Sequence, residues 1–135
     1  MAGVPNNFAF IDGQNAHLGV SALGWKLDWK KFRVYLTEHY GVSRAYFFIG
    51  YLAENQALYT NLQNYGYTLV FKPVTYRSEG KPKGNVDAEL VLQAMIEYPH
   101  YEGAVLVTSD GDFACLAQYL YDQRKLARVL SPNRK

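Results

Sequence analysis

Short apolar runs alternate with helical patterns along this chain, and that alternation is the strongest constraint on its fold. Most of the runs are apolar on both faces and rich in aromatic or β-branched residues. Strands of this kind belong to parallel sheets that helices cover on both sides. The five predicted strands are Phe8–Ile11, Ala45–Ile49, Tyr67–Phe71, Ala104–Thr108 and Leu126–Leu130.

Four helical patterns lie between these strands. The first follows Asp28, which can cap a helix N-terminus, and it stops at Gly41. The others cover about residues 54–65, 86–98 and 112–123, and Gly66 and Pro99 end the first two of these. Alternating strands and helices predict a three-layer α/β/α sandwich with a central parallel sheet and right-handed crossovers. We expect one domain over residues 1–135.

Composition narrows the class of protein. About half of the 135 residues are apolar (49%), enough for a substantial core. The sequence has no apolar run of membrane-spanning length and no basic leader, so we expect a cytoplasmic protein without a membrane partner. Cys115 is the single cysteine, which fits a reducing compartment. The net charge of +2 is too small to indicate a nucleic-acid partner by itself.

Acidic residues follow two of the predicted strands directly. Asp12 comes after the first strand, in IDGQN, and Asp110 and Asp112 come after the fourth, in TSDGDF. In open parallel sheets, ligands bind beyond the carboxyl ends of the strands, where the strand order reverses. These three aspartates are therefore expected at the functional edge of the sheet.

Two predicted helices begin with an aspartate on an apolar stripe. The stripe of the third helix consists of Asp87, Leu90, Val91, Ala94, Met95 and Tyr98, with Glu89, Gln93 and Glu97 on the opposite, solvated face. The stripe of the fourth consists of Asp112, Cys115, Leu116, Tyr119 and Leu120, which makes Cys115 a core residue. Each aspartate could instead be an ordinary N-terminal acid that the helix dipole favours.

Convergence of these four aspartates favours a metal site over capping. Like charges at close quarters repel one another, and buried carboxylates are costly unless they are neutralised. Carboxylate oxygens are the ligands that Mg²⁺ and Mn²⁺ prefer. A site of this kind suits hydrolysis of phosphodiesters.

The segments FIDGQN, KGNVDAELVL and LVTSDGDF resemble the three signature segments of NYN domains, the LabA-like branch of the PIN-like nuclease superfamily. The resemblance covers nearly the whole chain and implies a Mg²⁺- or Mn²⁺-dependent ribonuclease that leaves 5′-phosphate and 3′-hydroxyl ends. It assigns the metal to Asp12, Asp87, Asp110 and Asp112. Asn15 would orient a ligand water or the substrate phosphate, and Thr108 would hydrogen-bond a carboxylate or a loop amide.

Other features leave alternatives open. Arg77, Lys81 and Lys83 lie in a Gly/Pro-rich loop that either contacts the RNA backbone or is a solvated connector. Many relatives have an acid where this chain has Gln93, and they usually continue into a further helix after the fifth strand. The rival functions are an RNA-binding or regulatory module without turnover and a metal-dependent phosphotransfer enzyme for small phosphates. Association into a homo-oligomer is also open.

Overall fold

A computed structural model describes residues 6–13, 28–51, 56–73, 75–76, 82–83, 87–108 and 113–130 of the 135-residue chain. Its centre is a five-stranded parallel sheet in the order β3-β2-β1-β6-β7. The strands are β1 (Asn7–Asp12), β2 (Val42–Tyr51), β3 (Tyr67–Pro73), β6 (Ala104–Val107) and β7 (Leu126–Leu130). All five predicted strands are therefore present, and the expected parallel α/β fold is confirmed.

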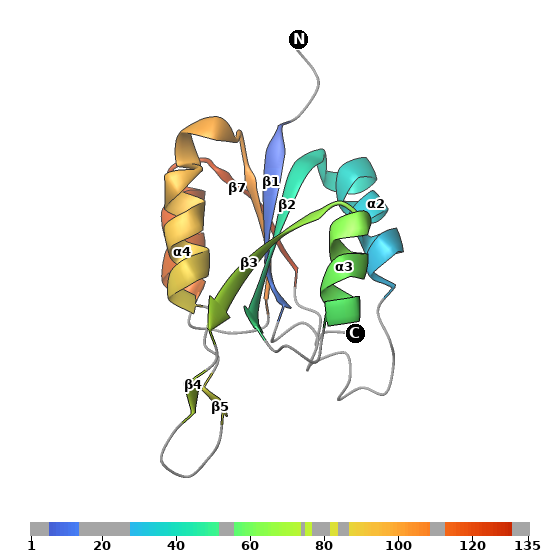
Figure 1. Ribbon diagram of the computed structural model, residues 1–135. Helices are drawn as coiled ribbons and strands as arrows, with labels where there is room; N and C mark the ends of the chain where they lie inside the picture. The colour runs from blue at the N-terminus through green and yellow to red at the C-terminus, as the bar shows by residue number, and fades with distance from the viewer. Residues whose placement is uncertain are drawn as a thin grey trace.

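Helices cover both faces of this sheet (Figure 1). One face carries α4 (Asp87–Ile96) and α5 (Ala114–Asp122), and the other carries α2 (Trp29–Tyr40) and α3 (Gln56–Asn64). A short 3₁₀ helix, η2 (Tyr98–His100), follows α4. A small antiparallel pair, β4 (Thr75–Tyr76) and β5 (Pro82–Lys83), stands apart from the main sheet. Within the described residues, no helix is both long and apolar enough to span a membrane.

The central strand β1 contributes to a hydrophobic core on each face of the sheet. Phe8 and Phe10 pack with residues under α4 and α5, whereas Ala9 and Ile11 pack with residues under α2 and α3. Side chains alternate between the two faces of a strand, so an all-apolar strand is stable only where both faces are covered. The sequence FAFI therefore occupies the position that its composition requires.

The ends of α2 match the sequence expectation. The Asp28 carboxylate accepts a hydrogen bond from the Lys31 backbone N–H at 3.1 Å and so caps the helix. At the other end, Gly41 adopts a left-handed conformation with φ 62°, which a glycine enters without steric cost. The cap and the stop fix the length of the helix and return the chain to the start of β2.

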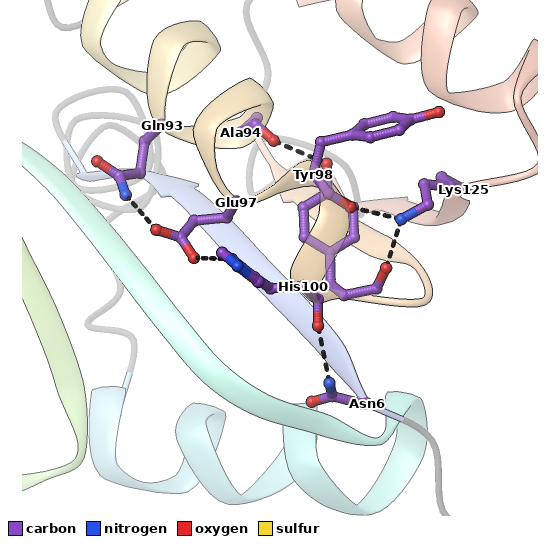
Figure 2. Close-up of polar contacts among 8 residues, drawn as sticks. Asn6, Gln93, Ala94, Glu97, Tyr98, His100 and Lys125 are labelled. Atoms are coloured by element: carbon purple, nitrogen blue, oxygen red, sulfur yellow. Dashed lines mark hydrogen bonds and ion pairs between the residues drawn. The ribbon is translucent and has the colours of Figure 1, made fainter.

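The exposed side of α4 differs from the prediction. Leu90 and Ala94 are buried as expected, but the polar residues predicted on the solvated face are half-buried. Gln93 donates a hydrogen bond to Glu97 at 3.0 Å, and the other Glu97 oxygen lies 3.1 Å from Nδ1 of His100 (Figure 2). These contacts satisfy the polar groups where they lie against the protein. The exposed apolar residues of α4 are Val91, Leu92, Met95 and Ile96.

The helix α5 is likewise turned relative to its predicted stripe. It begins at Ala114, and its buried residues are Leu116 and Leu120, with Phe113 buried just before it. Cys115 is exposed, so the interpretation of this cysteine as a core residue is wrong. The predicted stripe and the observed one share Leu116 and Leu120; the packing of Phe113 then decides which flank turns inward.

Lys125, just before β7, is hydrogen-bonded to the segment that follows α4. Its ammonium group donates to the carbonyl oxygens of Tyr98 and Tyr101 at 2.5 and 2.6 Å and lies over both rings (Figure 2). The Tyr101 hydroxyl in turn donates to the Ala94 carbonyl at 2.9 Å, and burial raises the pKa of this hydroxyl to about 12. Together these bonds fix the turn that leads from α4 into β6.

Replacing Lys125 with Met should therefore destabilise the fold. Met has a similar length but no donor, so the two carbonyl groups lose their charged partner at a cost of about 1–3 kcal/mol. Urea unfolding measures the change, and Lys30→Met on the exposed side of α2 is the matched control, with little expected effect. Equal stability of the two variants would contradict a fastening role for Lys125.

Candidate functional site

Asp12 ends the central strand β1 and is almost completely buried, with 1% of its surface exposed. It is paired in register with Phe48 of β2, and the preceding residue, Ile11, is paired with Val107 of β6. The apolar run of β1 carries this carboxylate to the carboxyl edge of the sheet between two neighbouring strands. Burial of a carboxylate is costly unless a hydrogen bond or a cation compensates it, so a partner for Asp12 is expected there.

Thr108 follows β6 directly and contacts this aspartate. Its hydroxyl donates to Oδ2 of Asp12 at 3.3 Å, and both side chains are buried. The Thr108 backbone N–H donates to the Leu130 carbonyl of β7 at 2.9 Å, which holds the residue in place. Of the two partners expected for Thr108, a carboxylate or a loop amide, the structure shows the carboxylate; its role in a catalytic site stays a prediction.

The edge at which these residues meet is the switch point of the sheet. After β1 the chain adds β2 and β3 on one side, and then it crosses to add β6 and β7 on the other. Asp12 ends β1 and Thr108 directly follows β6, and the strand order reverses between these two strands. Open parallel sheets bind their ligands at this position.

The N-terminus of α4 lies at the same edge. Gly103, which follows the segment after α4, accepts a hydrogen bond from Phe8 at the amino end of β1, so α4 runs antiparallel to the strands. Its first residue, Asp87, therefore starts at the carboxyl edge (Figure 1). Leu90 and Ala94 pack into the core with Phe10 and hold the helix against the sheet.

Gly13 is a residue of this site that motif reasoning did not single out. A Cβ atom at this position would lie 2.2 Å from a ring carbon of Phe47 and 2.8 Å from the backbone oxygen of Phe48. No side chain fits there unless the backbone moves. Gly13 lets the end of β1 remain in close contact with β2. The signal in the sequence was the Asp-Gly pair.

Several of the predicted site residues lie outside the described part of the chain. These are Asn15, Asp110, Asp112, Arg77 and Lys81. Lys83 belongs to β5, where it pairs with Thr75. Within the described residues, no group of three or more acidic, histidine or cysteine side chains could hold a metal. Glu89, predicted on the solvated face of α4, is half-buried and has one buried carboxylate oxygen.

Comparison with known proteins identifies the family. The NYN domain matches residues 8–135. The chain belongs to the NYN family. This family is part of the PIN-like nuclease superfamily, whose members generally use divalent metals. A comparison with curated proteins gives no match.

A solved structure supports the fold independently. A protein of unknown function from Vibrio parahaemolyticus is similar to this chain with a TM-score of 0.82 and 22% sequence identity. The similarity covers 97% of this chain and 84% of the other. At 22% identity, the similarity concerns the fold alone. Membership of the NYN family indicates a nuclease-type enzyme in general.

Replacing Gly13 with Ala should lower the free energy of unfolding. A Gly→Ala change ordinarily stabilises a protein by about 0.4–1 kcal/mol where the backbone tolerates it. Here the added carbon would displace Phe47 and the backbone of β2, so we expect a loss of about 1–3 kcal/mol. Urea unfolding measures whether the free energy of unfolding falls or rises. A variant more stable than the wild type would show that β1 and β2 are not in such close contact.

Proposed function

We propose that this protein is a metal-dependent ribonuclease that hydrolyses RNA phosphodiester bonds at the carboxyl edge of its sheet. The cation would be Mg²⁺ or Mn²⁺, held by aspartates. The observation that carries the proposal is the buried carboxylate of Asp12, which accepts a hydrogen bond from Thr108 at the switch point of an NYN-family fold.

The donor set at this edge suits a hard divalent cation. Asp12 ends β1 and Asp87 begins α4, while Asp110 and Asp112 lie in the sequence between Thr108 and the start of α5. All four side chains supply oxygen, and none supplies nitrogen or sulfur, which Zn²⁺ prefers. Carboxylates brought to one edge by separate elements gain from a shared cation because it offsets their mutual repulsion.

Each residue of the proposed site has a separate role. Asp12, Asp87 and Asp110 would hold the cation directly, and Asp112 would do so directly or through a water molecule. Thr108 fixes the orientation of Asp12 through its hydroxyl, and Asn15 would orient the attacking water or the substrate phosphate. When bound, a divalent cation stabilises the charge that develops on the phosphate and makes a nearby water more acidic.

The Gly/Pro-rich loop with Arg77, Lys81 and Lys83 starts from the same edge, and its charge favours RNA as the substrate. The pair β4–β5 connects the carboxyl end of β3 to the N-terminus of α4 and projects beyond the sheet (Figure 1). Arg77, Lys81 and Lys83 belong to this connection. Contacts between cations and phosphates position a nucleic acid without reading its sequence. The proposed substrate contacts would therefore tolerate many RNA sequences.

One observation keeps a module without turnover as the second candidate. Gln93 occupies the position at which many relatives carry an acid, and its amide is hydrogen-bonded to Glu97. That residue thus contributes no charge to a second cation. If two cations are essential for hydrolysis in this fold, the protein would bind RNA and metal without cutting.

Cleavage should depend on the cation and on the aspartates. Purified protein with Mn²⁺ should cut single-stranded or hairpin RNA, and a chelator should reduce cleavage to background. Asp12→Asn and Asp110→Asn should do the same, because an amide binds a hard cation more weakly than a carboxylate. Asp122→Asn is the matched control: Asp122 is exposed at the end of α5, so full activity is expected.

An assay with RNA, DNA and free nucleotides distinguishes the three candidate functions. Cleavage of RNA, with DNA and free nucleotides left intact, supports the ribonuclease. RNA binding without cleavage supports the regulatory module, and turnover of free nucleotides alone supports the phosphotransfer enzyme. Undiminished RNA cleavage by Asp110→Asn in a highly purified preparation would remove that residue from the catalytic site.

Thermal unfolding tests the metal site without knowledge of the substrate. Removing one of several crowded like charges should stabilise the metal-free protein. In chelator, Asp87→Asn should therefore melt at a higher temperature than the wild type, with a free energy of unfolding larger by about 1 kcal/mol. Mn²⁺ should stabilise the wild type because it binds the folded site and scarcely binds the unfolded chain. The helix-dipole alternative predicts the opposite sign, a loss of about 0.3–1 kcal/mol. A lower-melting mutant beside a wild type indifferent to Mn²⁺ would favour that alternative.

A further inference from the structure

The side of α4 that faces the solvent is apolar. Leu92 and Ile96 are 61% and 52% exposed, and Val91 and Met95 are exposed to a smaller degree. The ring of Tyr98, in the 3₁₀ helix after α4, contacts that of Tyr119 on α5, which is also exposed. We call Val91, Leu92, Met95, Ile96 and Tyr119 the α4–α5 surface.

The orientation of α4 shows that this exposure is a property of the fold. A helix on a sheet normally turns its polar residues outward and its apolar residues inward. In α4 the polar residues Glu89, Gln93 and Glu97 are half-buried, and apolar residues face the solvent instead. Leu90 and Ala94, which pack into the core with residues of the sheet, hold the helix in this orientation. A surface of this kind gains free energy when another surface covers it.

We propose that the α4–α5 surface is the interface through which two copies of this chain form a symmetric dimer. Val91 and Met95 form one ridge with a spacing of four residues, and Leu92 and Ile96 form a second ridge beside it. Two such ridges fit the grooves between the same ridges of a second α4, at a crossing angle of about −50°. A two-fold axis through the crossing places identical residues on both sides.

The area of this surface agrees with a dimer of ordinary size. Taking roughly 180 Å² for a whole residue of this size, the five exposed fractions leave on the order of 400 Å² of apolar surface in water. A standard interface covers about 800 Å² on each partner, and slightly more than half of that is apolar. The α4–α5 surface would therefore supply the apolar centre, and residues around it the polar rim.

The two helices lack positive charge, which argues against the other classes of partner. Lys125, beside the ring of Tyr98, is bonded to two backbone carbonyl groups. Neither α4 (DAELVLQAMI) nor α5 (ACLAQYLYD) contains a lysine or an arginine. Binding to RNA requires cations that neutralise phosphates, and helices that lie on membranes usually carry Lys or Arg beside the apolar face. The chemistry of the surface matches an apolar partner without strong charge. A second copy of the same surface has these properties.

The test is the mass of the full chain in solution, measured by sedimentation over roughly 1 to 100 µM protein. The wild type should be a dimer that dissociates on dilution. Leu92→Ala combined with Ile96→Ala should weaken the dimer at least tenfold. Alanine favours the helix, so this variant should remain folded, which circular dichroism verifies. Leu92→Glu combined with Ile96→Glu should give a monomer.

Val34 supplies the matched control. It is 49% exposed on α2, which covers the opposite face of the sheet, so Val34→Ala and Val34→Glu should leave the dimer unchanged. A wild type that is monomeric throughout the concentration range would overturn the proposal. So would a dimer that tolerates both pairs of α4 substitutions, or one that the Val34 variants weaken equally.

Discussion

The burial of β1 on both faces is the constraint on which the rest of the structure depends. Phe8 and Phe10 anchor one layer of helices, and Ala9 and Ile11 anchor the other. Because both faces are covered, β1 must occupy the middle of the sheet, and its neighbours must be parallel strands that return by crossovers. The buried end of the same strand is Asp12. Hydrophobic burial thus determines both the layer order and the location of the candidate site.

The sequence was sufficient for most of the fold because local signals and tertiary packing agree. Asp28 and Gly41 end α2 in the structure as they do in the pattern, and each apolar run became a strand. The pairing of Asp12 with Thr108 could be anticipated in part, since both follow strands whose carboxyl ends meet at one edge. The close approach at Gly13 could not, because it depends on where the Phe47 ring lies.

Periodicity failed where it had to choose between two flanks of a helix. Leu90 and Ala94 on α4, and Leu116 and Leu120 on α5, satisfy more than one choice of buried side. In α4 the buried side is the one on which Leu90 and Ala94 meet the core, and in α5 Phe113 joins Leu116 and Leu120 in the same core. Such contacts depend on three-dimensional neighbours, so the misplacement of Cys115 and the half-buried Gln93 are errors of rotation, while the elements themselves were correct.

The pairing of β1 with β6 has a consequence for the order in which the protein matures. Asp12 and Thr108 are separated by 96 positions in the chain, yet they must be in contact to complete the site. During synthesis β1, β2 and β3 emerge long before β6, and one side of β1 then has no strand to pair with. The first half of the chain cannot form the contact between Asp12 and Thr108. Formation of the Asp12–Thr108 contact is therefore tied to the synthesis of β6, which comes late in the chain.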